Sequence, residues 1–484
     1  MKQQFKNATA SCLIVLCSNL ATYSTQANAS GLPSLGDYSS SIVSLDTEYK
    51  LGQRIIRQIR NANDSIEDPI TESYVHDLIW DLVTTSQLSD KRISPIVIGN
   101  LSVNAFAAPG GVLGIHSGII LAAQSEAELA SVISHELAHL SQRHFAAQLE
   151  QQRLSTPFSM ASLLAGILVS VANPQAGIAV LTGSQASQIS SALAFSRRNE
   201  QEADRIGMLN LVNSGYDAFA MPKMFSRLYD LQKLQGSVPP EFLLTHPTSS
   251  SRIADSRNRA EQTGSSKGRR ASLDFDIIQA RLDAKFAQKR KLSINHFRSK
   301  SQNSNNAKNI FTLALVAANS QQYAEAKKLF SSLPKAWRNH LLVQLSAAEV
   351  DIDSRHLKEA LIRLKRLNQN YPKHIAVQLL YAQAFLAAGQ ANDAIKQLKE
   401  VTQYAADSIE AWYLISEAYG LAGNQTQTHV SRIEYFLLKG QVSAAERQLS
   451  FARREQRLSQ EQTYMLDDLE AHIAEVKSYM NVKF

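Results

Sequence analysis

Cysteine is nearly absent from the sequence, which contains only Cys12 and Cys17. Both lie in an N-terminal segment that begins with lysines, continues with a short apolar run and ends in an Ala-Asn-Ala tripeptide at Ala29. This order is typical of a secretory signal peptide, so we predict that residues 1–29 are cleaved after about Ala29, and an uncleaved anchor is the alternative. The exported chain would then contain no disulfide, no thiolate zinc site and no cysteine nucleophile. Export without cysteine fits a bacterial periplasm, which is the location we predict.

The sequence also lacks an apolar run of the roughly 20 residues that a membrane-spanning helix needs. Between residues 160 and 183, two shorter apolar runs flank Asn173-Pro174 and predict two short helices, either buried or lying on the surface. This segment separates two groups of candidate site residues. It is therefore also a candidate lid over the site, and loosening it would then speed up peptide cleavage.

No cluster of lysine and arginine is interleaved with aromatic residues, although the formal net charge is +7. This absence argues against nucleic-acid binding. A modestly basic surface fits acidic partners instead, or peripheral contact with an anionic surface such as the outer membrane. The hydrophobic content of 44% predicts a globular protein, and the length of 484 residues predicts two or three domains.

The segment His135-Glu136-Leu137-Ala138-His139 contains the residue types of a hydrolytic zinc site. On a helix, His135 and His139 lie one turn apart, so both imidazoles project from one face and can bind one metal ion. Glu136 lies beside the open coordination position, where a carboxylate can take a proton from water. Ser125 followed by Glu128 predicts the start of this helix. A surface helix with two unrelated histidines is the alternative that this motif alone leaves open.

A catalytic zinc site needs a third protein ligand and an open fourth position. A histidine six residues after His139 would complete one common pattern, but that position holds phenylalanine and His144 is one residue short. We therefore predict Glu200 as the third ligand, with Asp204 one helical turn later accepting a hydrogen bond from a ligating histidine. Glu202 lies on a different face of that helix, where we expect a structural or solvent-exposed role.

Three short apolar segments, residues 96–98, 104–107 and 112–115, predict a small sheet before the zinc helix, with a turn at 109–111. An exposed sheet edge can hold an extended peptide by backbone hydrogen bonds. A purely structural sheet is an equal alternative. If the edge binds substrate, the candidate substrate-binding residues are Asn104, Ala105, Phe106 and Ala107.

From about residue 305 the sequence is helical and repetitive. Gly389 and Gly423 are 34 residues apart, which is the period of tetratricopeptide repeats. We predict four to six units, some degenerate, stacked into an α-helical solenoid with a concave surface over residues 305–484. An irregular helical bundle is the alternative. A polar, basic segment rich in small residues precedes the repeats, so residues 263–304 are predicted to be a linker and connecting helix.

Taken together, these motifs resemble peptidase family M48, a family of zinc metallopeptidases. The resemblance spans residues 45–262 and rests on the segment 104–111, the His-Glu-x-x-His motif, the Glu-x-x-Ala-Asp motif at 200–204 and a Thr-His-Pro segment at 245–247. It implies a mostly α-helical protein with an α+β head. The head would be a gluzincin-type peptidase domain with a small β-sheet, followed by the tetratricopeptide-repeat solenoid. The residues that the resemblance implies are His135, His139 and Glu200 as ligands of one Zn²⁺, and Glu136 as the general base.

His246 and Arg252 follow the candidate ligands in a separate segment. Three roles are open for His246: it stabilises the oxyanion of the tetrahedral intermediate, it occupies the fourth zinc position and holds the enzyme inactive, or it is a loop histidine with neither role. Arg252 is a candidate neighbour for a substrate carbonyl, and so a candidate substrate-binding residue, or for an acidic residue of the site.

A peptidase head followed by a protein-binding solenoid predicts a periplasmic zinc metalloendopeptidase that acts on protein substrates. The exported, repeat-bearing branch of the family, which this sequence resembles, implies quality control and assembly of outer-membrane β-barrel proteins. The implied partners are the β-barrel assembly machinery, bound through the repeats, and stalled or unfolded barrels that are degraded or helped to mature. Two alternatives stay open: a periplasmic chaperone or scaffold whose proteolysis is secondary, and a general peptide-degrading enzyme.

Overall fold

The computed structural model describes residues 44–148, 196–235, 240–263, 272–455 and 458–480, apart from residues 63, 64, 67 and 305. These residues belong to one compact unit, Ser39–Phe484. The predicted signal peptide at 1–29 and the predicted lid at 160–183 lie outside the described residues, so both stay predictions.

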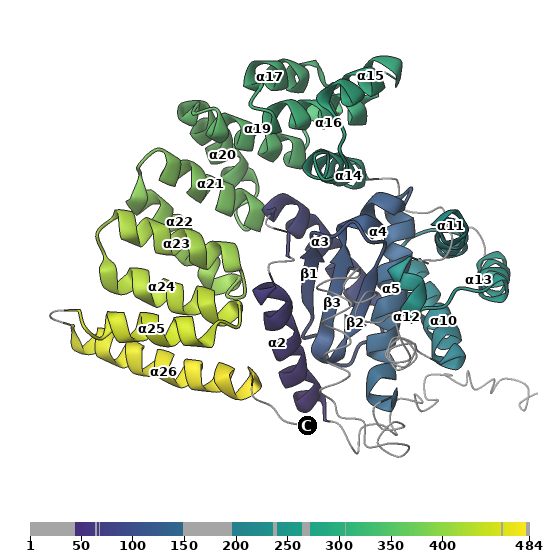
Figure 1. Cartoon of the computed structure of the whole chain (residues 1–484), viewed down its shortest axis with the longest axis horizontal. Coiled ribbons are helices and arrows are strands. Elements are labelled where there is room, and N and C mark those ends of the chain that lie inside the picture. Colours follow the sequence, from purple (N-terminus) through teal and green to yellow (C-terminus); the bar gives the residue numbers. More distant parts are fainter. Residues whose placement is uncertain are drawn as a thin grey trace, which may run out of the picture. The chain divides into compact units, whose positions relative to one another are not determined.

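A three-stranded sheet forms from the segments predicted as strands: β1 Ser94–Ile98, β2 Ala105–Ala108 and β3 Val112–His116. β3 lies in the middle, parallel to β1 and antiparallel to β2 (Figure 1). The register pairs Ala105 with Ile115 and Ala108 with Val112. β2 is therefore an edge strand of the sheet, as the interpretation of residues 104–107 required.

The turn between β2 and β3 is the short 3₁₀ segment η2, Pro109–Gly111, and it packs against helix α2, Leu45–Asn61. Gly110 has a φ of 71°, in the left-handed region that favours glycine. A Cβ atom at this position would lie 2.3 Å from the backbone oxygen of Glu48. The hairpin can therefore sit directly on α2 only because residue 110 has no side chain.

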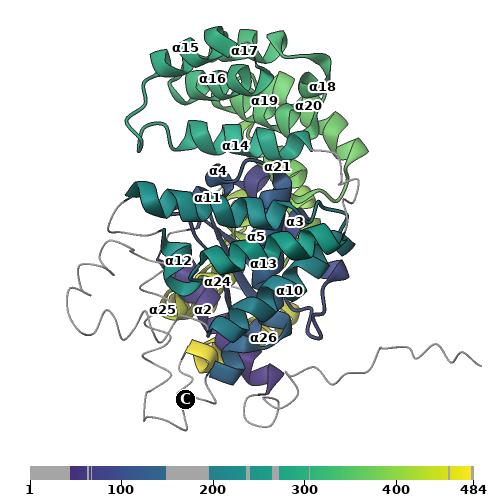
Figure 2. The same ribbon diagram turned by 90° about the vertical axis from the view of Figure 1, so that its right-hand side faces the viewer.

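Among the described residues, seven further helices surround the sheet. The helices are α3 Pro69–Thr85, α4 Ser117–Ala122, α5 Glu126–Ser141, α10 Arg197–Asn213, α11 Ala220–Gln235, α12 Glu241–Thr245 and α13 Ser250–Thr263. α5 packs against β2, α3, α10 and α11, and α13 packs against both α10 and α11 (Figure 2). The predicted start of α5 is confirmed, because the Ser125 hydroxyl accepts a hydrogen bond from the Glu128 N–H. Every residue of α5 from Glu128 to His139 is buried. The polar side chains of the His-Glu-x-x-His motif therefore lie in the interior of the protein.

The C-terminal part consists of consecutive helices that pack on their neighbours in sequence (Figure 1). They are α14 Leu273–Lys285, α15 Ile294–Ser304, α16 Ala307–Asn319, α17 Tyr323–Ser332, α18 Lys335–Arg338, α19 Leu341–Asp353, α20 Leu357–Asn370, α21 Ile375–Ala387, α22 Ala391–Tyr404, α23 Ile409–Leu421, α24 Gln425–Leu438, α25 Val442–Ala452 and α26 Gln460–Met480. Gly389 and Gly423 follow α21 and α23 with φ values of 74° and 75°. The glycines that revealed the period thus end the first helix of successive pairs, and the predicted fold class is confirmed.

Helix α14 joins the two parts through polar contacts as well as apolar packing. The Gln279 amide donates hydrogen bonds to the carbonyl oxygens of Ile120 and Ala123, each at 2.7 Å. Arg281 forms a buried ion pair at 2.8 Å with Asp68, which is the N-cap of α3. One apolar core runs continuously from α3 to α21. The domain boundaries at 262–263 and 304–305 stay predictions.

Among the described residues, no helix is both long enough and apolar enough to cross a membrane.

Candidate metal centre

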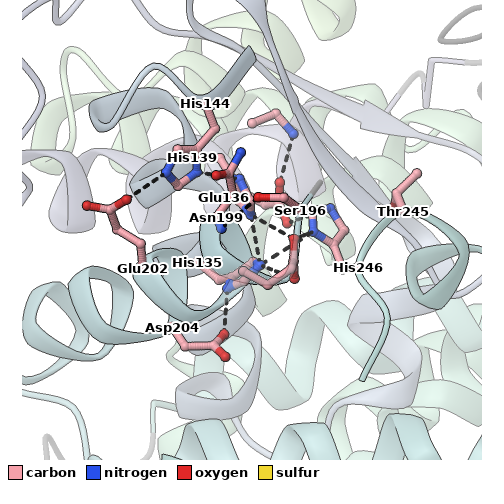
Figure 3. Close-up of polar contacts among 12 residues, drawn as sticks. His135, Glu136, His139, His144, Ser196, Asn199, Glu202, Asp204, Thr245 and His246 are labelled. Carbon is pink, nitrogen blue, oxygen red and sulfur yellow. Dashed lines mark hydrogen bonds and ion pairs between the residues drawn. The ribbon is translucent and has the colours of Figure 1, made fainter. Parts of the chain in front are cut away.

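The crossing of α5 and α10 brings the three predicted zinc ligands together. The Nε2 atoms of His135 and His139 are 3.1 Å apart. Glu200 enters from α10, with its carboxylate oxygens 3.6 Å from His135 Nε2 and 3.4 Å from His139 Nε2. All three side chains are at most 2% exposed. The two imidazoles lie side by side in Figure 3. With the Glu200 carboxylate from α10 they converge on one point inside the protein.

The donor set fits a zinc ion. One ligand atom from each of His135, His139, Glu200 and His246 can be chosen so that all four lie within 4.8 Å of one another. Nitrogen and carboxylate oxygen are the donors that catalytic zinc sites use. The Oε1 atom of Glu136 is also buried there and accepts no hydrogen bond from the described residues, His246 Nε2 being 3.5 Å away, and a water at the site would satisfy it. A buried polar group of this kind is expected where a ligand binds.

Glu136, which follows the first predicted ligand, His135, is oriented by the sheet. Its Oε2 atom accepts a hydrogen bond of 2.9 Å from the backbone N–H of Ala107 in β2. Burial raises the pKa of Glu136, while nearby His246 and His135 act in the opposite direction. A carboxylate with a raised pKa is a stronger base, which suits proton transfer near neutral pH.

Asp204 and Arg252 form the outer layer of the site. The Oδ1 atom of Asp204 is 3.0 Å from His135 Nδ1, the nitrogen that faces away from Glu200. Burial acts to lower the pKa of His135, but the two nearby acids, Asp204 and Glu200, outweigh this effect. Together they raise the pKa of His135 to about 9. Arg252 contacts both acids: its Nη1 is 2.7 Å from Glu200 and its Nε and Nη2 donate to Asp204. Of the two neighbours considered for Arg252, these contacts favour the acidic residues, and its substrate-binding role stays a prediction.

His246 lies at the end of α12 and points into the metal site. Its Nδ1 is 3.0 Å from Glu200 and 3.5 Å from His135 Nε2, and its Nε2 is 3.5 Å from Glu136. The ring stacks on Phe242 with a centroid distance of 4.7 Å. The Phe242 N–H in turn donates to the carbonyl of Val103, ahead of β2. His246 is therefore brought to the ligands by a short helix that is tied to the sheet.

The predicted substrate-binding strand lies beside Glu136. Asn104 and Ala105 are buried, and the Asn104 carbonyl accepts a hydrogen bond from the His116 N–H. Phe106 is half-buried and covers Gly114, where a Cβ would lie 2.3 Å from its ring. Ala107 directs its N–H to Glu136. The geometry places the edge strand next to Glu136, the predicted base, while the substrate-binding roles of residues 104–107 stay predictions.

Comparison with known proteins identifies the family. The model of peptidase family M48 matches residues 69–260, and a tetratricopeptide-repeat model matches residues 351–418. The chain is 33% identical over 367 residues to the β-barrel assembly-enhancing protease of Escherichia coli strain K12, covering 75% of each chain. This chain belongs to peptidase family M48. The predicted metallopeptidase class is thereby confirmed, and the family implies a metal.

Other relatives in the family match shorter parts of this M48 peptidase. A Vibrio cholerae protein, also described as a β-barrel assembly-enhancing protease, is 40% identical over 256 residues, which are 53% of this chain and about half, 52%, of that protein. The mitochondrial metalloendopeptidase OMA1 of Arabidopsis thaliana is 32% identical over 168 residues, 35% of this chain and 32% of that protein.

Gly207 is a site residue of the M48 chain that sequence reasoning missed. It lies on the same face of α10 as Glu200, two helical turns further along. A Cβ there would lie 3.0 Å from the Cα and N atoms of His135. The absence of a side chain therefore sets how closely α10 approaches α5, and so where Glu200 stands relative to the histidines. A glycine inside a helix, at an offset of seven from a candidate ligand, was the available signal.

His144, which the sequence analysis set aside as a ligand, lies between His139 and Glu202. The Nδ1 atom of His144 is 3.0 Å from Nδ1 of His139. Its Nε2 is 3.4 Å from Glu202, whose side chain is 22% exposed. The sequence-based expectation of a structural or solvent role for Glu202 did not anticipate this contact.

Glu241, at the start of α12, should make the stability of the protein depend on pH. Burial raises its pKa to about 7, while nearby Ser102 and Asn104 act in the opposite direction. Because the folded state binds this proton more tightly than the unfolded state, stability should fall as the pH rises through about 7. Glutamine carries no charge at either pH. The change in the free energy of unfolding caused by Glu241→Gln should therefore be more favourable at pH 8 than at pH 4.5, by roughly 2–3 kcal/mol. Urea unfolding at both pH values measures this, and an equal effect at both would contradict it.

Proposed function

We propose that this chain is a periplasmic zinc metalloendopeptidase that cleaves protein substrates. The proposal is carried by the buried convergence of His135, His139 and Glu200 around one point, with Glu136 beside it. Membership of family M48 supports the same conclusion. The signal-like N-terminal sequence supports export to the periplasm.

The residues of the site divide the chemistry among them. Zinc bound by His135, His139 and Glu200 would polarise the scissile carbonyl and lower the pKa of water at the open position. Glu136 takes the proton from that water and delivers it to the leaving amine, because its carboxylate is buried and oriented by the Ala107 N–H. Asp204 holds the His135 ring by its outer nitrogen. Arg252 balances the negative charge of the two acids.

His246 is proposed to occupy the fourth ligand position in the resting enzyme. Its Nδ1 atom is 3.0 Å from Glu200, closer than the Nε2 atoms of His135 at 3.6 Å and His139 at 3.4 Å, and its ring stacks on Phe242. If this is correct, His246→Ala should raise the rate of cleavage of an unfolded protein, about tenfold for each 1.4 kcal/mol by which the capped state is favoured. A loss of rate with an unchanged zinc content would support an oxyanion-stabilising role instead. Phe242→Leu, which loosens the ring without removing it, should change the rate in the same direction but less.

The substrates are proposed to be outer-membrane β-barrel proteins that have stalled during assembly, and the β-barrel assembly machinery is the proposed partner of the repeats. The names of the E. coli and Vibrio relatives support this assignment. The tetratricopeptide match at 351–418 supports a protein-binding role for the C-terminal helices. Outer-membrane barrels expose strand edges while they are unfolded, and the edge strand β2 is suited to pair with such a segment.

Photocrosslinking in cells tests the partner assignment. Tyr404 and Tyr413 are each 44% exposed on the repeat helices, so a photoreactive residue at these positions should capture a component of the assembly machinery or a barrel protein. Lys223, which is 62% exposed on α11 in the peptidase part, is the matched control position. Capture of the same proteins from all three positions would contradict a specific repeat surface. Point labels are preferable to deleting residues 271–484, because α14 and α16 share the apolar core of the peptidase part.

A further inference from the structure

The two zinc-ligand histidines are held unequally by α10. Asp204 contacts the outer nitrogen of His135 directly, at 3.0 Å. At the corresponding nitrogen of His139 the structure shows a contact with His144, with 3.0 Å between the two Nδ1 atoms. His144 is 4% exposed, and its ring meets that of His139 nearly edge-on, at an interplanar angle of 75°. The outer nitrogen of His135 thus contacts a carboxylate, that of Asp204, whereas the outer nitrogen of His139 contacts the imidazole of His144 (Figure 3).

The protons of this contact can be arranged in one order that suits metal binding. His139 directs Nε2 toward His135 and Glu200, so a metal bound there takes that lone pair and the proton of His139 stands on Nδ1. The Nδ1–H of His139 then donates to Nδ1 of His144. The proton of His144 must in that case stand on Nε2, where the Glu202 carboxylate accepts it at 3.4 Å. The result is a directed chain from Glu202 through His144 to His139.

The backbone holds His144 in this position. Helix α5 ends at Ser141, and Arg143 has a φ of 50°, a left-handed conformation that is uncommon for a side chain other than glycine. This residue is fixed by its guanidinium, which is 2.7 Å from the Glu48 carboxylate on α2. The reversal at Arg143 turns the chain back so that His144 faces the last turn of α5. Strained backbone of this kind is retained where the surrounding contacts over-determine it.

We propose that His144 and Glu202 are positioning residues that fix the tautomer and ring orientation of the ligand His139. This inference rests on the proposed zinc site. In α10, alternate residues would then serve one centre: Glu200 as a ligand, Glu202 behind His139 through His144, and Asp204 behind His135. Outer partners of ligating histidines commonly change metal affinity by 10- to 100-fold when they are removed.

Zinc affinity, measured by competition with a chelator on the full-length protein, tests the inference. His144→Leu should weaken zinc binding by about 10- to 100-fold. His144→Asn, whose side-chain oxygen can accept from His139 in place of Nδ1, should recover most of that loss. The visible spectrum of the Co²⁺-substituted protein should change in the Leu variant and return toward wild type in the Asn variant. Wild-type affinity and spectrum in the Leu variant would overturn the inference, as would equal losses in the Leu and Asn variants.

Glu202→Gln provides the second arm. It should weaken zinc binding in the wild-type background and have no further effect in the His144→Leu background, because Glu202 acts through His144. Additive losses in the double variant would overturn the proposed chain. Gln201→Ala, at an exposed position of the same helix, is the matched control and should bind zinc like wild type. Unfolding of the zinc-free variants separates a general folding defect from a loss of metal affinity. A wild-type protein that binds no zinc would refute the proposed function itself. This result differs from the outcomes above, in which the wild type binds zinc and only the variants test the roles of His144 and Glu202.

Discussion

Glu136→Gln is expected to lower kcat/KM for protein cleavage by about 10²- to 10⁴-fold, which is the range attributed to a positioned general acid–base group. Glutamine is nearly the same size as glutamate and can still accept the hydrogen bond from the Ala107 N–H, but it cannot take a proton from water. The loss should therefore appear in kcat, with zinc content and folding unchanged. Cleavage of an unfolded protein, together with metal analysis of the purified variant, measures both quantities.

The same variant also separates the proposed peptidase from a scaffold. If the repeats carry the function and proteolysis is secondary, Glu136→Gln should still support outer-membrane barrel assembly in cells. Glu128→Gln is the matched control, because Glu128 is a buried glutamate of the same helix, two turns before His135, whose carboxylate pairs with Arg227. Cleavage by Glu136→Gln at the wild-type rate would contradict the assigned base.

Arg252→Met is expected to destabilise the zinc-loaded protein by about 3–5 kcal/mol, the range found when one partner of a buried charge network is removed. Arg252 is 5% exposed and is the cation that contacts both Glu200 and Asp204 at 2.7 Å. Methionine fills much of the volume but leaves two buried carboxylates without their positive partner. Urea unfolding of the zinc-loaded protein measures the loss, and zinc affinity should change with it because Glu200 is a proposed ligand.

An exposed arginine on the repeats is the control for this prediction. Arg432 pairs with Glu417, and the two side chains are 42% and 43% exposed. Arg432→Met should change the free energy of unfolding by less than about 1 kcal/mol, because water already screens that pair. A loss for Arg252→Met no larger than that of the control would show that the buried network does not stabilise the folded site.

Local patterns predicted the main elements correctly because each pattern acts over a few residues. A capping serine and continuous burial define α5, and alternating apolar segments separated by a Pro-Gly-Gly turn define the hairpin. The 34-residue spacing of Gly389 and Gly423 marks helix ends, since both residues adopt left-handed backbone conformations there. The spacing of His135 and His139 places both on one helical face wherever that helix lies.

Contacts between segments that are distant in sequence could not be predicted from local patterns. The position of His246 depends on α12, which is tied to the sheet by the hydrogen bond of Phe242 to Val103. The sequence left three roles open for His246 because nothing in a loop motif defines the distance to a metal. Arg252 likewise had two candidate neighbours, and its contacts with Asp204 and Glu200 appear only when α13 packs on α10.

The sequence by itself determined the metal-binding motif on α5, the family resemblance, the small sheet and the repeat period, because all of these depend on residue types at short, regular spacing. Tertiary structure alone decided that His246 faces the ligands, that Ala107 orients Glu136, that Gly207 sets the approach of α10, and that His144 lies behind His139. These are contacts between surfaces brought together by the core, and their distances depend on helix crossings and backbone reversals that no local pattern encodes.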